Sequence, residues 1–158
     1  SKAMFNVCYR MMNNREEAED VLQDAFTQAF MKLDSYRYES GFGAWLKRIV
    51  INACINAKSK RKVELRFFDD LQKFDALDEQ VDNDEMLQFS VQGIKKAMEK
   101  LPEGGRMIFS LYLFEGYDHG EISQIMNITE STSKSQFMRA KRRVIEIFNE
   151  QKKEQYEN

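Results

Sequence analysis

The residues best suited to chemistry lie in one basic stretch near the carboxyl end of the 158-residue chain. Its basic side chains are Lys134, Arg139, Lys141, Arg142 and Arg143, and the hydroxyl side chains around its start are Ser131, Thr132 and Ser135. Hydroxyls at the start of a helix and cations along it suit contacts with the phosphates and base edges of DNA. The alternative is that these residues form the solvated face of an ordinary helix.

The residues before this stretch favour DNA binding, because they predict a helix-turn-helix. Asp118 and Glu121 have the spacing of a capping box that starts a short helix. Asn127 suits the left-handed turn that ends this helix, and Thr129 suits the cap of the longer basic helix that follows. In this motif the second helix enters the major groove. We expect one face of that helix to point away from the core, with Ser131, Lys134, Ser135, Met138, Arg139 and Arg142.

Two amphipathic segments at the start of the chain predict the first helices of a small bundle. Apolar and aromatic residues predominate in 4–12, and because the chain begins inside this pattern we expect residues to be missing before Ser1. Asn14 and Glu17 have capping-box spacing, and apolar residues then recur at steps of three and four up to Leu33. The opposite face of the second helix suits a basic protein partner. This acidic stripe consists of Glu16, Glu19, Asp20, Gln23, Asp24 and Gln28.

A loop rich in aromatic and polar residues, 34–41, precedes a third apolar stripe. This stripe runs from Phe42 to Cys54 and predicts a third helix, packed on the first two through about residue 62. We interpret Trp45 as a core residue because it lies on the stripe. The polar face of the helix carries Arg48, Asn52, Asn56, Ser59 and Lys60.

Charge is segregated along the chain, although the net charge is only -2. Residues 47–66, which include Lys58, are basic, residues 69–85 are acidic, and residues 134–143 are basic again. Two basic regions separated by an acidic one predict two phosphate-facing surfaces and a linker. Hydrophobic periodicity is also lost over about residues 63–84, and the phenylalanines of this segment indicate that it docks on another surface. These phenylalanines are Phe67, Phe68 and Phe74.

We therefore predict an all-α protein made of two small helical bundles joined by an acidic linker. Residues 1–62 form the first bundle, 63–84 the linker, 85–150 the second bundle with its helix-turn-helix, and 151–158 a tail. One proline and seven glycines leave long stretches without helix breakers, which agrees with this fold class.

The sequence offers no support for catalysis, for a cofactor or metal site, or for membrane insertion. It contains one histidine, His119, and has neither a glycine-rich phosphate loop nor a nucleophile elbow. Cys8 and Cys54 stand far apart in apolar segments, which predicts buried reduced thiols. No apolar run approaches the roughly 20 residues of a membrane span, and no signal peptide opens the chain. We expect a cytoplasmic protein that is not an enzyme and needs no cofactor.

Two blocks in the first half resemble region 2 of the group IV, or extracytoplasmic-function (ECF), sigma factors. They are NREEAEDVLQDAF at 14–26 and FGAWLKRIVIN at 42–52. The second half independently resembles region 4 of the same family, in LPE at 101–103, FEGY at 114–117, EI at 121–122 and STSKSQFMRA at 131–140. The resemblance covers nearly the whole chain apart from the linker and tail. It implies a bacterial transcription initiation factor that binds core RNA polymerase and directs it to promoters.

The resemblance also implies how the −10 promoter element is read. The loop 36–42 corresponds to the loop that holds a flipped-out base, and Asn52 to a polar residue that helps to read that base. Unpaired bases stack on aromatic rings and offer their edges to amides, although simple packing is the alternative for the tyrosines. The expected −10 residues are Tyr36, Tyr38, Arg48, Asn52 and Asn56.

Region 4 is expected to read the −35 element. Base-facing positions correspond to Lys134, Ser135, Met138 and Arg139, and phosphate-side positions to Ser131, Thr132 and His119, although His119 could equally be a surface residue without a role. The expected −35 residues of the helix-turn-helix are Ser131, Thr132, Lys134, Ser135, Met138, Arg139, Arg142 and Arg143. The surface that docks on the polymerase corresponds to Asp20, Gln23 and Asp24. The implied partners are core RNA polymerase, promoter DNA and an anti-sigma factor.

Three departures from good local patterns accompany the resemblance. Gly120 replaces a better helix former, Gly104-Gly105 is a weak helix start, and Met138 suits a thymine methyl group better than a hydrogen bond. A stand-alone helix-turn-helix regulator is the alternative, but it leaves the first sixty residues without a role. A helical adaptor without DNA binding leaves the basic helix unexplained.

Overall fold

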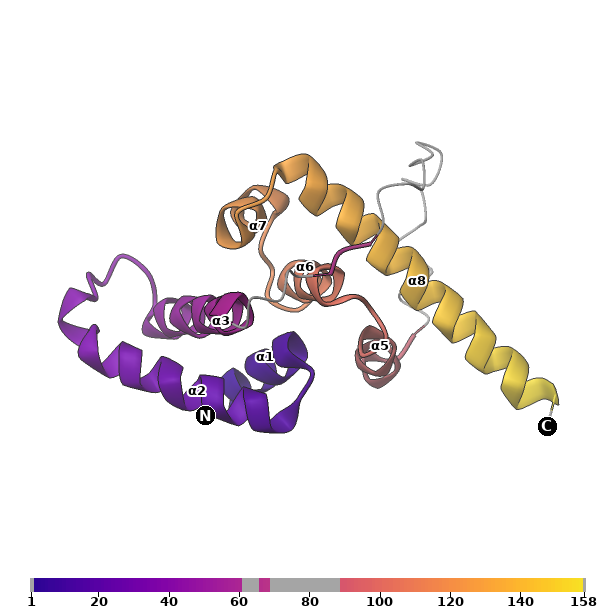
Figure 1. The fold of residues 1–158 in the computed structure, drawn as a ribbon, viewed down its shortest axis with the longest axis horizontal. Coiled ribbons are helices and arrows are strands. Elements are labelled where there is room, and N and C mark those ends of the chain that lie inside the picture. Colours follow the sequence, from indigo (N-terminus) through magenta and orange to yellow (C-terminus); the bar gives the residue numbers. More distant parts are fainter. Residues whose placement is uncertain (1, 61–65, 69–88, 158) are drawn as a thin grey trace. The chain divides into compact units, whose positions relative to one another are not determined.

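The computed structural model describes residues 2–60, 66–68 and 89–157. All regular secondary structure in these ranges is helical, as predicted (Figure 1). The chain divides into two compact units, Ser1–Leu65 and Arg66–Asn158, which are described separately below.

The first unit is a bundle of three α-helices, each of which packs on the other two. The helices are α1 (Lys2–Met12), α2 (Arg15–Met31) and α3 (Phe42–Lys60), with a 3₁₀ turn, η1 (Leu33–Ser35), after α2. Apolar residues at helical spacing meet in its core, which includes Val7, Cys8, Met11, Ala18, Ala25, Val50, Ile51 and Cys54. The predicted three-helix bundle is therefore correct.

The start of α2 is set by two asparagines and an ion pair. Asn13 adopts the left-handed conformation (φ 55°) that turns the chain after α1, and the Asn14 side chain accepts a hydrogen bond from the Glu17 N–H at 3.1 Å. The Glu17 carboxylate lies 3.5 Å from the ammonium nitrogen of Lys58 on α3. Lys58 is 7% exposed, so its inclusion in a phosphate-facing surface was wrong. A charge pattern does not reveal which basic side chain turns inward to a carboxylate.

Two cysteines that are 46 positions apart in sequence meet in this core. Cys8 on α1 and Cys54 on α3 are both buried free thiols, as expected. Their thiols are hydrogen-bonded to each other, and this bond together with burial raises the pKa of Cys54. Both thiols therefore belong to the packing between α1 and α3.

The second unit gathers three shorter helices against one long helix. The shorter ones are α5 (Val91–Met98), α6 (Glu103–Leu113) and α7 (His119–Met126), and all three pack on α8 (Glu130–Glu157). The core includes Ala97, Met98, Met107, Ile108, Phe109, Leu111, Ile122, Ala140, Val144 and Ile147. Its central helix, α8, thus supplies both core residues and the basic stretch identified in the sequence.

The second unit also includes the segment Arg66–Phe68, which was expected to belong to the linker. The rings of Phe67 and Phe68 pack over Gly104 and Gly105 at the start of α6. This contact explains the glycine pair, which is a weak helix start in sequence terms. The third linker phenylalanine, Phe74, lies outside the described residues.

In the part of the chain that the structure describes, no helix is both long enough and apolar enough to cross a membrane.

Candidate nucleic-acid interface

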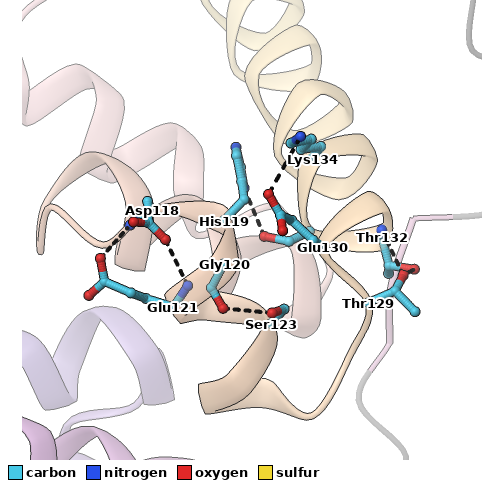
Figure 2. Close-up of polar contacts among 10 residues, drawn as sticks. Asp118, His119, Gly120, Glu121, Ser123, Thr129, Glu130, Thr132 and Lys134 are labelled. Atoms are coloured by element: carbon cyan, nitrogen blue, oxygen red, sulfur yellow. Dashed lines mark hydrogen bonds and ion pairs between the residues drawn. The ribbon is translucent and has the colours of Figure 1, made fainter.

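The turn between α7 and α8 is held by the side-chain caps that the sequence predicts (Figure 2). The Glu121 N–H donates to the Asp118 carboxylate at 2.7 Å, which lowers the pKa of that carboxyl, and the Asp118 N–H donates to the Glu121 carboxylate at 3.4 Å. Asn127 is left-handed (φ 54°, ψ 49°), and the Thr132 N–H donates to the Thr129 hydroxyl at 3.0 Å. The predicted capping box, left-handed turn and second cap are therefore all correct, and they fix where α8 begins.

A hydrogen bond also joins the two helices of the motif, α7 and α8. The Nδ1 atom of His119, the first residue of α7, lies 2.8 Å from the hydroxyl oxygen of the fully buried Ser133 on α8. The imidazole also stacks on the Tyr112 ring, with 4.6 Å between centroids. Burial, and next the charge of Lys134, lower the pKa of His119. The structure gives His119 a role within the motif, which the sequence did not reveal.

The first turns of α8 expose several of the expected DNA-facing residues. Ser131 and Lys134 are exposed, and Thr132, Ser135 and Met138 are half-buried. The Lys134 ammonium nitrogen lies 3.6 Å from the Glu130 carboxylate, one turn earlier on the helix (Figure 2). Since both side chains of this ion pair are largely exposed, the pair is weak and leaves Lys134 able to exchange Glu130 for a phosphate or a base.

Arg139 is buried, although the sequence predicted that it would be exposed to DNA. It is 9% exposed, whereas the helical pattern placed it on the outer face with Lys134 and Met138. Lys141 is buried as well. Both residues flank Ala140, which lies on the buried stripe of α8. Helical periodicity alone does not tell how far a buried stripe extends sideways.

The next two arginines, Arg142 and Arg143, are half-buried. The Arg143 guanidinium lies 3.1 Å from the Glu146 carboxylate and 3.6 Å from that of Glu150. These contacts hold Arg143 against later turns of α8, further along the helix from the turn with α7.

An aromatic cluster lies between η1 and the start of α3 in the first unit. The ring of Tyr36 lies 4.5 Å from that of Tyr38, 5.2 Å from Trp45 and 5.8 Å from Phe42, measured between centroids. The Tyr36 hydroxyl donates to the Ser40 carbonyl oxygen, which closes the loop. Tyr38 is 84% exposed and left-handed (φ 62°), an uncommon conformation for a residue other than glycine. The structure therefore brings both expected tyrosines together and presents one of them to solvent.

Trp45 and Phe42 belong to this cluster, which corrects the interpretation of Trp45 as a core residue. Trp45 is half-buried, and Phe42 is exposed. Asn52 and Asn56 are exposed and Arg48 is half-buried on α3. Trp45 and Asn52 are seven residues apart, so they share one face of α3 and the aromatic cluster continues into a polar stripe. Phe42 was not among the expected site residues. The closely spaced aromatic residues at 36, 38, 42 and 45 could have indicated that it belongs to the site.

The acidic stripe of α2 is exposed at Asp20, Gln23 and Asp24. At its carboxyl end two large apolar side chains point outward, with Phe30 80% and Met31 78% exposed. Each lies seven residues after a stripe residue, so they extend the same face of the helix. Neither residue was expected to bind a partner. Their positions off the buried stripe of α2 could have predicted that they are exposed. This surface therefore combines acidic and apolar groups.

Comparison with known proteins finds one region of the same protein family in each unit. Residues 1–63 match Sigma-70 region 2, and residues 92–144 match Sigma-70, region 4. The chain is 29% identical to the ECF RNA polymerase sigma factor SigW of Bacillus subtilis (87% of this chain, 79% of the relative). It is 31% identical to SigM of the same organism (88% and 84%) and 33% identical to the ECF RNA polymerase sigma-E factor of Escherichia coli K12 (79% and 70%).

A solved structure is similar as well. The sigma factor RpoE from Bartonella quintana, crystallised in complex with the anti-sigma factor NepR, aligns with a TM-score of 0.63 and 25% identity, over 94% of this chain and 91% of that one. The two family regions occur in the same order as the two units described above. The chain belongs to the ECF group of the sigma-70 family, the non-enzymatic factors that direct RNA polymerase to promoters.

Proposed function

We propose that this sigma factor reads its promoters with two surfaces, the outer face of α8 for the −35 element and the aromatic cluster with the polar stripe of α3 for the −10 element. The observation that carries the proposal is the capped turn at Asn127, which fixes the start of α8 while Ser131 and Lys134 stay exposed. A rigid helix start with exposed hydroxyl and ammonium groups is suited to a DNA groove.

On α8 we assign different tasks to successive turns. Lys134, Ser135 and Met138 would face bases, with Met138 against a thymine methyl group. Ser131 and Thr132 at the helix start would contact phosphates, as would Arg142 and Arg143 about three turns further along. With 9% of its surface exposed, Arg139 fits a supporting role beneath this face better than the base contact that its position in the family motif suggests.

In the first unit we assign Tyr38 to stacking on an unpaired base. Its ring is exposed and rests on Tyr36, whose hydroxyl is already engaged by Ser40. Base–aromatic stacking contributes about 1–3 kcal/mol for each base. Asn52 and Asn56 would offer their side-chain amides to base edges, and Arg48 would pair with a phosphate of the DNA backbone.

We propose that the acidic stripe of α2 with Phe30 and Met31 docks on core polymerase. Exposed aromatic and methionine side chains are typical of the centre of a protein interface, and Asp20 and Asp24 would complement a basic partner. A chain with a net charge of -2 gains little from counterion release on DNA by itself. The polymerase would therefore supply most of the affinity, and this chain the choice of sequence.

We further propose that an anti-sigma protein controls this factor, and that it acts in the cytoplasm, where polymerase and chromosome lie. The likeness to RpoE of Bartonella quintana, which was crystallised with the anti-sigma factor NepR, supports the first point. Co-purification of the tagged chain from its own host, followed by a test of whether the captured protein blocks transcription, would check it.

Reconstituted run-off transcription tests the two-surface proposal. Core polymerase with the full chain is expected to initiate at a small set of genomic fragments, and changes in either element of those promoters should abolish initiation. If scrambling the −35 element leaves initiation unchanged while scrambling the −10 element abolishes it, the assignment of α8 is wrong.

A further inference from the structure

The segment Arg66–Phe68, here called the strap, is joined to two helices of the second unit by hydrogen bonds. At α6, the Gly104 N–H donates to the Arg66 carbonyl oxygen at 2.8 Å. At α8, the Phe68 N–H donates to the side-chain oxygen of Gln136 at 2.8 Å, and the Gln136 amide donates back to the Phe68 carbonyl oxygen at 3.0 Å. Because Gln136 is 1% exposed, water competes little for this pair of bonds.

The rings of the strap cover the start of α6. A Cβ atom on Gly104 would lie 2.5 Å from the Phe67 ring, and one on Gly105 would lie 2.4 Å from the Phe68 ring. A side chain at either position therefore requires the neighbouring ring to move away. Glycine is a poor helix former, so the close contact with the strap explains why two glycines follow each other in α6. The strap is thus a packed element of the second unit.

Gln136 lies on the side of α8 that faces the rest of the unit. The same side carries Ser133, which is hydrogen-bonded to His119 of α7, and Phe137, whose ring stacks on that of Phe109 of α6 with 5.6 Å between centroids. The first turns of α8 are therefore held by α7, by α6 and by the strap, each through a different residue. The side chains that we propose to face bases alternate with these three residues along the helix, and they are Lys134, Ser135 and Met138.

The hydrogen bonds of Gln136 restrict the rotation of α8 about its own axis. A rotation of about 20° moves a side-chain tip that lies about 5 Å from the axis by about 2 Å. A hydrogen bond tolerates a spread of roughly 0.5 Å, so this rotation breaks both bonds to Phe68 and displaces the outer side chains from base edges by a similar amount. Phosphate contacts position the unit as a whole on the duplex. The rotation of α8 within the unit therefore determines which of its side chains meet the bases.

We infer that the strap is a positioning element for −35 recognition, with Gln136 as the positioning residue. In this role the strap touches neither bases nor phosphates and acts by fixing the rotation of α8. A fully satisfied pair of buried hydrogen bonds is suited to this task, because it specifies one arrangement of the packed elements. The −35-reading unit then begins at Arg66, although the match to region 4 begins at residue 92. The inference rests on the −35 reading proposed above and deepens it.

The first test removes the Gln136 bonds and measures base preference. Gln136→Leu keeps nearly the same side-chain volume but cannot bond the peptide groups of Phe68. Discrimination is measured with holoenzyme made from the full chain, as the ratio of initiation from the preferred −35 element to initiation from a scrambled one. It should fall at least about fivefold, the lower end of what one specific base contact contributes. Helical content and binding to a pre-melted template with the −10 element alone should stay unchanged.

The second test displaces the strap without a change in α8. Gly104→Ala with Gly105→Ala pushes both rings away, and because alanine is the better helix former this pair does not weaken α6 itself. The same loss of discrimination is expected. Gly93→Ala is the matched control, because its Cβ atom would lie 2.3 Å from the ring of Phe148, about three turns along α8 from Gln136. This similar clash away from the strap should leave discrimination unchanged.

Amide hydrogen exchange of the full chain measures the docking of the strap directly, and it decides the matter even if Gln136→Leu folds poorly. The Phe68 N–H should be protected in the unmodified chain, and the alanine pair at 104 and 105 should raise its exchange rate by about tenfold. Rapid exchange of this N–H in the unmodified chain overturns the inference, because the strap is then not held on α8.

The transcription results can overturn the inference in two further ways. If Gln136→Leu and the alanine pair keep full discrimination, the strap does not position α8, and the −35 reading by α8 still stands. If Gly93→Ala lowers discrimination as much as they do, the loss comes from a general loosening of the unit. Absence of −35 discrimination by the unmodified holoenzyme would instead show that the proposed −35 reading is wrong.

Discussion

The Nδ1 atom of His119 lies 2.8 Å from the hydroxyl of Ser133, and this contact ties the first residue of α7 to the buried side of α8. Ser133 directly precedes the exposed Lys134 on this helix. This bond therefore helps to fix the orientation of the face that we propose for DNA, without any DNA group having to touch it.

Ser133→Ala should lower the free energy of unfolding by about 1 kcal/mol, because it removes the partner of a half-buried imidazole. His119→Gln is the matched change, since its amide can still bond Ser133 and should cost less. Urea denaturation of the full chain measures both. Equal stability of Ser133→Ala and the unmodified chain would show that the bond contributes nothing.

The partial burial of His119 also predicts a pH dependence of stability. Burial lowers the pKa of His119 below its ordinary value of 6.5, so the unfolded chain takes up the proton more readily than the folded one. The free energy of unfolding should therefore fall as the pH drops through 6.5, and this contribution should level off below the folded pKa. Unfolding curves at several pH values, compared with those of His119→Gln, isolate the contribution. If the pH dependence of the free energy of unfolding persists in His119→Gln, it arises from other groups.

Arg139 and Arg143 should respond differently to substitution. Arg139→Ala is expected to lower stability by removing a buried stem, and Arg139→Met, which keeps that stem, should restore it without changing the order of preference among −35 sequences. Arg143→Ala should instead weaken all promoters alike and reduce the salt dependence. A library of −35 variants transcribed by each holoenzyme makes the comparison. A shift in preference at one base pair with Arg139→Met would restore the base contact to this residue.

Tyr38→Ala should impair strand opening without destabilising the fold, because exposed side chains seldom contribute more than about 0.5 kcal/mol. Permanganate reactivity of unpaired thymines reports opening on duplex and on pre-melted templates. We expect loss on both templates if Tyr38 holds a base, and rescue by pre-melting if it acts only in separating the strands. Asn52→Ala should follow the same pattern. Full activity of Tyr38→Ala on both templates would remove it from the site.

Phe30→Ser with Met31→Ser should weaken capture by core polymerase while leaving the helical content unchanged. Asp24→Lys with Gln23→Lys should weaken it through charge, and more so at low salt. Val91→Ser, an exposed apolar residue of the second unit, is the control. Pull-down at two salt concentrations measures these effects. Undiminished capture by both pairs would mean that the polymerase docks elsewhere on the chain.

Local signals in the sequence were sufficient to predict the order of the helices, several of their caps and the family, although α8 continues to Glu157, where a tail was expected. The capping box at Asp118, the left-handed Asn127 and the apolar repeat of α2 each act within a few residues, so they hold wherever the segment packs. The second helix of the helix-turn-helix was identifiable for the same reason.

Only the tertiary structure decided which polar and aromatic side chains are available to partners. Lys58 turns inward to Glu17, Arg139 lies along the edge of a buried stripe, and Trp45 joins an aromatic cluster instead of the core. The outcome for Lys58 depends on a carboxylate 41 positions away in the sequence, so no local pattern predicts it. The hydrogen bond between Phe68 and Gln136 is the clearest example. These residues are 68 positions apart in the sequence, so no local pattern predicts that they meet.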